Sequence, residues 1–390
     1  MKRPATRALL AALKGEARFV GGCVRDALLK RPIGDIDLAT PLFPDEVMRR
    51  LAAAGIKVVP TGLAHGTVTA LIERHPFEIT TLRRDVETFG RHANVAFTSN
   101  WAEDSRRRDF TMNALYLAAD GEIFDYQEGL RDLRRGKVRF VGDPATRIRE
   151  DVLRLLRFYR FNAWYGKGTA DEAARVACRA STPLLPTLSG ERVQAELLKL
   201  FGAKDPVPSL TLMQEDGVLA RIVPKSRPLD VVARLIKLEP KPDALRRLAA
   251  LVAAEGDALA RKLKFSNTDR DRLIALHDTV PLTSDAAEQR QLLYRMGREL
   301  YVDRVLLTAA IADDTATVKK LLGAAAKWKP VTFPLRGADI AEAGVPEGPV
   351  IGRLLAEIEA WWEEGDFKAT HAQCLAELQR RLTATPSLRA

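Results

Sequence analysis

The order of hydrophobic and polar residues changes along the chain and predicts two kinds of structure. Before Pro144, short apolar runs with alternating character are separated by short amphipathic stretches. Runs that end at Val20 or cover residues 33–39, 66–72 and 77–82 predict strands, and residues 24–29 and 45–54 predict helices. The pattern therefore predicts an α+β domain at the start of the chain.

After Pro144 the period of the pattern becomes helical. Ile148, Val152, Leu155 and Tyr159 recur at steps of three or four residues, which is typical of one face of an amphipathic helix. This character continues to the end of the chain. Proline-containing loops are expected at residues 205–208, 239–242 and 329–335. The whole chain is therefore expected to be an α+β head followed by an all-α region.

Composition narrows the class of protein. A chain of 390 residues with 46% hydrophobic and 29% charged residues is expected to form two to four folded domains and is not a disordered polyelectrolyte. No apolar run has the length of a membrane helix. Cys23, Cys178 and Cys374 lie far apart without zinc spacing, which indicates reduced thiols in a cytoplasmic protein. The net charge of +10 favours an anionic partner such as nucleic acid.

Two aspartates in the head domain form the first candidate site. Asp35 and Asp37 are two residues apart in a predicted strand, so both carboxylates are expected to face the same way. A divalent cation relieves the repulsion between such carboxylates, and hard oxygen ligands suit Mg²⁺. This pair therefore predicts a magnesium site that can support transfer of a phosphoryl group.

Two glycines precede these aspartates at the start of a predicted helix. Gly21 and Gly22 allow backbone N–H groups to approach a phosphate closely, and the positive end of the helix points to the same place. Arg25, one turn further on, adds a cation that can form charge-assisted hydrogen bonds. Strand, glycine pair, helix and paired aspartates together predict a phosphate cradle beside a metal site.

The string GGCVRDALLKRPIGDIDL, residues 21–38, resembles the signature of the DNA polymerase β-like nucleotidyltransferases. It is most similar to the class II CCA-adding enzymes and the related bacterial poly(A) polymerases. Further segments resemble motifs of this family in the same order, at residues 77–83, 107–115, 142–161 and 189–200. The resemblance implies a nucleotidyltransferase head with a mixed sheet at residues 1–138, a helical neck at 139–204, a helical body at 205–310 and an RNA-binding helical tail at 311–390.

The resemblance also implies roles for single residues. Asp35 and Asp37 would bind Mg²⁺, with Glu78 as a third catalytic carboxylate. Gly21, Gly22 and Arg25 would hold the triphosphate of the incoming nucleotide.

The motif that begins at Arg107 adds further nucleotide contacts by resemblance. Arg108 and Asp109 would contact the sugar and phosphates, with Asn113 as a helper. A carboxylate at this place can accept a hydrogen bond from a ribose 2′-hydroxyl and so select ribonucleotides.

The helix expected after Pro144 would read the base. Asp151 and Arg154 are three residues apart and so share one helix face, which Arg157 and Arg160 continue. Cytosine and adenine both present an amino donor beside a ring-nitrogen acceptor, which a carboxylate and a guanidinium complement. Guanine and uracil present the reverse pattern and would leave both groups unpaired.

The implied activity is addition of CCA to the 3′ end of tRNA from CTP and ATP, with Mg²⁺ and without a template. A poly(A) polymerase or an enzyme that adds only CC or only A would have nearly the same head. Residues 61–67 look like the CCA-adding version, and the long segment 84–100 favours a complete enzyme. A non-catalytic RNA-binding protein is disfavoured because both aspartates are present, and no membrane association or obligate protein partner is expected.

The segment 84–100 between two predicted strands is expected to be a loop. It contains Gly90 and few apolar residues, which is typical of a mobile lid. The resemblance implies that this segment helps to switch the nucleotide pocket from C to A.

Overall fold

In the computed structural model, residues 4–73, 75–89, 92–253 and 256–384 are described. The chain divides into two compact units. The first comprises Met1–Leu229, Pro242–Leu248 and Ala258–Ser266, and the second comprises Asp230–Lys241, Ala249–Asp257 and Asn267–Ala390. Within the described residues, none of the helices combines the length and the apolar character that a membrane span requires.

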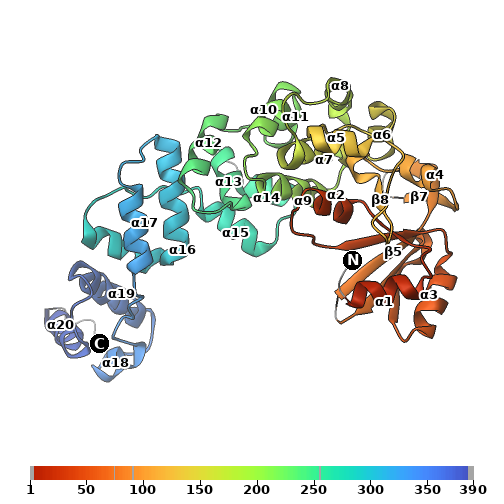
Figure 1. Ribbon diagram of the computed structural model, residues 1–390. Coiled ribbons are helices and arrows are strands. Elements are labelled where there is room, and N and C mark those ends of the chain that lie inside the picture. Colours follow the sequence, from red (N-terminus) through yellow and green to blue (C-terminus); the bar gives the residue numbers. More distant parts are fainter. Residues whose placement is uncertain (1–3, 74, 90–91, 254–255, 385–390) are drawn as a thin grey trace. The chain divides into compact units, whose positions relative to one another are not determined.

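The first unit begins with a mixed sheet of seven strands in the order β3-β4-β5-β2-β1-β8-β9 (Figure 1). Only β2 and β5 pair in parallel, and every other neighbouring pair is antiparallel. The strands are β1 (Arg18–Val20), β2 (Ile36–Thr40), β3 (Lys57–Gly62), β4 (Thr67–Ile72), β5 (His75–Thr81), β8 (Leu115–Leu117) and β9 (Ile123–Asp125). The predicted strands are confirmed, except that β2 begins at Ile36 and so leaves Asp35 outside it.

Helices pack on this sheet through buried apolar side chains. Buried Val20, Ala39, Leu82 and Tyr116 form one cluster of the core. The helix predicted at residues 24–29 is confirmed as α2, which begins two residues earlier, at Gly22, and contacts β1, β2 and β8. The helices of this part are α1 (Pro4–Ala12), α2 (Gly22–Leu28), α3 (Pro44–Ala53), α4 (Trp101–Arg106) and α5 (Gly129–Arg135), with single 3-10 turns at Leu63–His65 and Thr111–Asn113.

The segment 84–100 is not a loop, so that prediction is wrong. It belongs to a separate two-stranded antiparallel sheet formed by β6 (Arg83–Phe89) and β7 (His92–Phe97). Backbone pairing holds the strands together despite their few apolar residues. At the base, the Phe97 ring packs edge-on against the Phe43 ring with centroids 5.4 Å apart. Gly90 lies outside the described residues.

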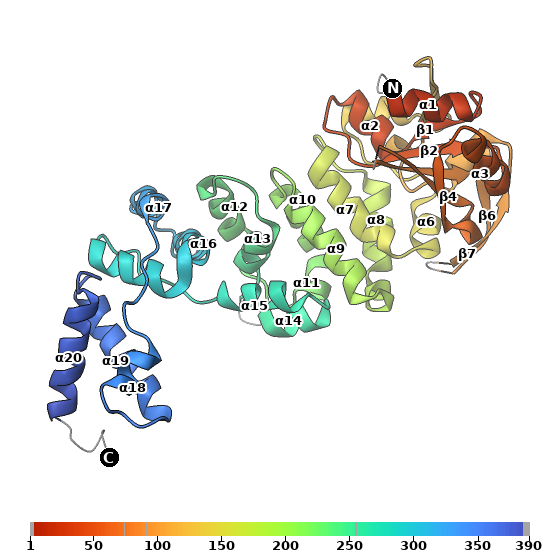
Figure 2. The same ribbon diagram turned by 90° about the horizontal axis from the view of Figure 1, so that it is seen from below.

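A group of helices follows the sheet, as the period of the sequence predicts. Figure 2 shows α7 beside α9 and α10, and α6 packs against α8. The Phe110 ring contacts the rings of Phe140 and Phe161, both at 4.8 Å between centroids, which ties the end of the sheet domain to α7. The helices are α6 (Pro144–Glu150), α7 (Leu153–Tyr165), α8 (Glu172–Ser181), α9 (Gly190–Phe201), α10 (Val207–Glu215) and α11 (Val218–Ile222), with a 3-10 helix at Thr182–Thr187.

Two predictions about these helices need correction. The single helix expected through Asp151 and Arg154 is two helices, because Asp151 has extended backbone angles (φ −150°, ψ 106°) between α6 and α7. The loop expected at residues 205–208 is shorter, since α10 already begins at Val207, with Pro208 in its first turn.

The second unit is helical. Its last part has a core of buried residues that include Ile340, Leu354, Ile358 and Leu378. Helix α16 is interrupted at Gly297, which has a φ of 76°. The remaining helices, of which the first three cross between the units, are α12 (Leu229–Leu238), α13 (Ala244–Leu251), α14 (Gly256–Lys262), α15 (Asn267–Ala275), α16 (Ala286–Ala312), α17 (Val318–Lys327), α18 (Gly337–Glu342), α19 (Pro349–Glu364) and α20 (His371–Ala384). The division into head, neck, body and tail stays a prediction.

Candidate active site

Three carboxylates lie at the parallel pair of strands in the centre of the sheet. Asp37 on β2 stands in register with Glu78 on β5, and Asp35 directly precedes β2. Burial raises the pKa of Asp37, and the negative charge of Glu78 raises it further; Arg108 opposes this rise and Asp35 adds to it. The charges of Glu78, Asp35 and Arg108 therefore all act on Asp37.

The chemistry of these donors suits a hard divalent cation. Carboxylate oxygens are ligands that Mg²⁺ prefers, and a cation would relieve the repulsion that raises the pKa of Asp37. Within the described residues, no group of three His, Cys, Asp or Glu side chains is close enough to hold a metal ion unaided. The arrangement fits an ion that takes its remaining ligands from substrate phosphates or water, which is how proteins usually bind Mg²⁺.

The glycine pair leaves room for two guanidinium groups. Gly21 has a φ of 73°, which favours glycine, and it caps the start of α2. A Cβ atom at Gly21 would lie 3.7 Å from Nη1 of Arg108, and one at Gly22 would lie 3.5 Å from Nη2 of Arg25. Two cations thus stand beside the glycine backbone, where a polyphosphate can approach closely.

The Arg25 guanidinium is held on several sides. It donates to both carboxylate oxygens of Asp26 at 3.0 and 2.8 Å, and to Oδ1 of Asn113 at 2.6 Å. The Tyr165 ring lies 4.2 Å from its Cζ atom, and the Tyr165 hydroxyl donates to Asp26 at 3.2 Å. Because Tyr165 belongs to α7, this cluster connects the glycine turn to the helix that carries Arg154 and Arg157.

Asp104 fixes the second guanidinium. It is fully buried and pairs with Arg107 at 2.7 Å and with Arg108 at 3.1 Å, and it accepts a hydrogen bond from the Tyr116 hydroxyl at 2.7 Å. Burial alone would raise the pKa of Asp104, but the two arginines and Tyr116 lower it to about 2. A permanently charged aspartate therefore positions Arg108 beside Gly21.

Asp109 is the centre of a third group. It accepts hydrogen bonds from Nδ2 of Asn113 at 3.0 Å and from Nε of Arg157 at 2.8 Å. Burial opposes ionisation, but the charge of Arg157 and these hydrogen bonds hold the pKa of Asp109 well below its usual range. Asp109 is thus a strong hydrogen-bond acceptor already joined to α7.

A cavity of about 310 Å³ brings most of the predicted nucleotide-binding residues together. Asp151 lines it from the break between α6 and α7, where Arg192 donates to both of its oxygens at 3.0 and 2.8 Å. Arg154 lines it as well and donates to Glu150 and, at 3.0 Å, to the carbonyl oxygen of Arg147. The lining residues are Arg107, Arg108, Asp109, Asn113, Asp151, Leu153, Arg154, Arg157 and Arg192.

Arg160 is the predicted nucleotide-binding residue on α7 that does not line this cavity. It pairs with the buried carboxylate of Glu196 on α9, which also lies 3.9 Å from Arg157. Burial lowers the pKa of Arg160. Its position suits a residue that helps to hold Glu196 and Arg157 in place.

Sequence reasoning missed several members of the site. Arg107 and Arg192 line the cavity, and Asp26, Asp104 and Tyr165 hold the arginines. Arg107 and Arg192 lie inside segments that the sequence had already singled out, so a search there for cations would have found them. Asp104 is three and four residues from Arg107 and Arg108, a helical spacing that could have indicated the pairs. Tyr165 carries no such signal, because folding brings Asp26 and Arg25 to it.

The chain is similar to known proteins along most of its length. The family model described as the poly A polymerase head domain matches residues 17–139, and the one described as the probable RNA and SrmB-binding site of polymerase A matches residues 169–228. The mitochondrial CCA tRNA nucleotidyltransferase 1 of Danio rerio is 32% identical over 94% of this chain and 87% of its own length. The CCA-adding enzyme of Limosilactobacillus fermentum is 32% identical over 90% of both chains.

A solved structure agrees with these relatives. The CCA-adding enzyme of Bacillus stearothermophilus, in a crystal structure with CTP, superposes with a TM-score of 0.82. It is 30% identical in sequence, and the match covers 99% of this chain and 100% of that one. The chain therefore belongs to the family of CCA-adding tRNA nucleotidyltransferases and related poly(A) polymerases.

Proposed function

We propose that this chain adds CCA to the 3′ end of tRNA without a nucleic-acid template, using CTP and ATP and releasing pyrophosphate. The observation that carries the proposal is the cavity in which Asp151 and Arg154 stand beside Asp109 and Arg157. Asp151 and Arg154 would take the place of a template base, and the neighbouring Asp109 would bind the ribose. The relatives that match along almost the whole chain carry the same activity in their names.

In this proposal the nucleotide triphosphate lies between the glycine turn and the paired acids. Arg25 and Arg108 bind its phosphate oxygens beside Gly21 and Gly22, and their fixed positions limit the cost of ordering them. Asp35 and Asp37 would hold Mg²⁺, with Glu78 in support. The ion would supply charge stabilisation for the oxygens that enter and leave the α-phosphorus.

The RNA 3′-hydroxyl then attacks the α-phosphorus, and pyrophosphate leaves. Glu78, in register with Asp37, is placed to accept or orient the proton of that hydroxyl, directly or through water. Asp109 stays ionised because Arg157 and Asn113 hold it, so it can accept a hydrogen bond from the ribose 2′-hydroxyl. In this reaction the residues of the chain mainly hold the reacting groups and their charges in position.

Base selection is assigned to Asp151 and Arg154. The carboxylate accepts a hydrogen bond from the amino group of cytosine or adenine, and the guanidinium donates to the adjacent ring nitrogen. In this chain the two groups enter the cavity from the break between α6 and α7 and from α7 itself, and Arg192 orients the carboxylate. Arg154 must exchange part of its contact with Glu150 for the base.

The expected compartment is the cytoplasm and the expected partners are tRNA, CTP and ATP, with no obligate protein partner. The three cysteines are buried and free, which agrees with a reducing compartment. Several relatives are named mitochondrial, so localisation of the tagged protein in its own cells would check this expectation.

The product distinguishes the proposal from its nearest alternatives. The descriptions of both matched family models name a poly(A) polymerase, so a poly(A) tail is the main alternative product. The chain is incubated with a tRNA transcript that lacks its 3′ CCA and with all four nucleoside triphosphates, and the new 3′ ends are sequenced. CCA ends support the proposal, a run of A indicates a poly(A) polymerase, and CC or a single A indicates a partial enzyme.

The paired aspartates provide a second test. Asp35→Ala or Asp37→Ala is expected to abolish nucleotide addition, while tRNA binding persists because Lys and Arg side chains provide it. Asp120→Ala, in the exposed turn between β8 and β9, removes an acid from the same domain and serves as control. Near-normal turnover of either variant at saturating Mg²⁺ would show that the acids have another role.

A further inference from the structure

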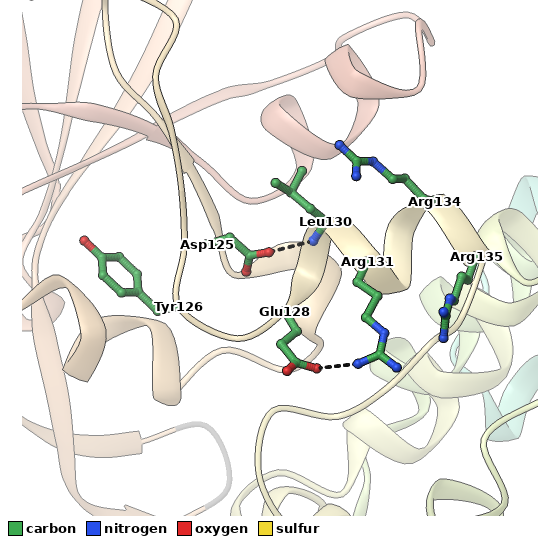
Figure 3. A pocket seen from close by; sticks show the side chains of 7 residues that line it. All are labelled: Asp125, Tyr126, Glu128, Leu130, Arg131, Arg134 and Arg135. Atoms are coloured by element: carbon green, nitrogen blue, oxygen red, sulfur yellow. Dashed lines mark hydrogen bonds and ion pairs between the residues drawn. The ribbon is translucent and has the colours of Figure 1, made fainter.

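A second hollow in the first unit is lined by arginines and shares no residue with the nucleotide cavity. It has a volume of about 570 Å³ and lies along α5 (Figure 3). Its lining consists of Asp125, Tyr126, Glu128, Leu130, Arg131, Arg134 and Arg135. Three of these seven residues are arginines from one short helix.

Both acids in the hollow already have partners. Asp125 accepts hydrogen bonds from the backbone N–H groups of residues 127, 129 and 130, at 3.2, 2.8 and 2.9 Å, at the start of α5. Glu128 pairs with Arg131 at 3.4 Å and with Arg139 at 3.2 Å. Neither carboxylate is available to the arginines at the other end of the helix.

Arg134 and Arg135 are the cations without such a partner. Both are exposed, and neither forms an ion pair with any residue in the described ranges. Figure 3 shows Arg131 and Arg135 projecting from α5 in the same direction, as expected for residues four apart on a helix, and Arg134 projecting to the other side. The hollow therefore carries uncompensated positive charge at a surface that a large ligand can reach.

The remaining lining favours a phosphate over a whole nucleotide. Tyr126 is the one aromatic residue of the lining, and in Figure 3 its ring points away from the arginines. Its hydroxyl already accepts a hydrogen bond from Arg18 at 3.2 Å. No ring thus faces the arginines for a base to stack on, whereas guanidinium groups match phosphate oxygens well.

We propose that the α5 arginines bind the phosphodiester backbone of the RNA substrate, apart from the nucleotide site. The inference rests on the proposed function, since it takes tRNA as the ligand. It adds a contact in the head, because α5 lies within the matched head model and outside the segment whose model is described as RNA-binding. Such a contact would fix the position of the RNA without reading its sequence.

A purely structural role makes a different prediction. Arg134 and Arg135 lie in the last turn of α5, where cations also stabilise the helix dipole. That role predicts a lower melting temperature after substitution and no change in the salt dependence of RNA binding. A phosphate contact instead predicts that RNA binding by the substituted chain depends less on salt.

The test measures binding of a fluorescently labelled tRNA transcript lacking its 3′ CCA over a series of KCl concentrations. For Arg134→Gln/Arg135→Gln, the Kd is expected to rise roughly tenfold and the slope of log Kd against log salt to fall by about 0.9 for each phosphate contact that is lost. Arg134→Lys/Arg135→Lys keeps both charges and should restore most of the slope. Thermal unfolding of both variants checks the fold.

The matched control is Arg7→Gln/Arg49→Gln on α1 and α3. It also removes two positive charges, from two other exposed positions of the head. If its Kd and slope equal those of Arg134→Gln/Arg135→Gln, the proposal is overturned. A wild-type chain that binds tRNA but adds no nucleotide would refute the proposed function alone, whereas one that binds no tRNA would refute both.

Discussion

Replacing Asp151 by asparagine tests how a protein without a template selects a base. The substitution keeps the shape of the side chain but replaces one carboxylate oxygen by an amide N–H₂ donor. Asp151 is held by Arg192, whose guanidinium donates to both of its oxygens at 3.0 and 2.8 Å. The asparagine retains one acceptor for Arg192, so the cavity is expected to keep its form.

The size of the effect follows from these contacts. A hydrogen bond to a charged group contributes about 1.5–3 kcal/mol, and the partial exposure of this pair places it near the lower limit. Loss of about 1.5 kcal/mol lowers kcat/KM for CTP and ATP about tenfold. The new N–H₂ group can donate to the carbonyl of uracil or guanine, which raises kcat/KM for UTP and GTP by a similar factor. The preference for C and A over U and G should thus fall about a hundredfold.

The assay is the ratio of kcat/KM values for the four nucleotides, measured with tRNA that lacks its last one or three nucleotides. Arg192→Met leaves the carboxylate but removes its support, and should lower the preference by about tenfold. Lys199→Met removes a charge from the exposed face of α9, the helix that carries Arg192, and serves as control. Unchanged ratios in Asp151→Asn, with an intact fold, would refute the assignment of base selection to this residue.

Three further predictions concern the support of the site. Tyr165→Phe removes the hydroxyl that donates to Asp26 and keeps the ring beside Arg25, so the KM for CTP should rise about fivefold with kcat nearly unchanged; an effect on kcat alone would contradict this role. The pKa of Asp104 is lowered to about 2, so its stabilisation is complete above the ordinary value of 3.8 and is lost as the pH falls toward the lowered value. Asp104→Asn should therefore have a free energy of unfolding about 2 kcal/mol below that of the wild type at about pH 5, as measured by urea unfolding. At about pH 3 this difference in free energy should be smaller by about 1 kcal/mol, and a difference that does not change with pH would exclude this linkage. Shortening the hairpin within residues 84–100 should leave CC addition intact and impair the final A, as seen in sequenced products; normal addition of all three nucleotides would make the hairpin a simple connector.

The order of elements and the glycine turn before α2 could be predicted from the sequence because their causes are local. A period of two or of three to four residues decides between strand and helix. The glycine at position 21 adopts a φ of 73°, and α2 begins directly after it, as the pair of glycines indicated. Asp37 also lies on the expected strand.

The geometry around Asp151 was decided by tertiary structure. Apolar residues recur at helical spacing from Ile148 to Tyr159, so their pattern predicts one helix, yet the chain breaks at Asp151. The partner of its carboxylate, Arg192, lies 41 residues further along the chain. A contact over this separation leaves no trace in local periodicity.

The sequence by itself thus determined which residues carry charge and which elements hold them, because backbone propensity and hydrophobic period act over a few residues. Tertiary structure decided which side chains complete the acid–arginine pairs: Tyr165 beside Asp26 and Arg25, and Tyr116 beside Asp104 and Arg108. Asp26 directly follows Arg25 and Asp104 is four residues from Arg108, but the two tyrosines come from other elements, and the strength of each pair depends on burial that only the folded chain creates.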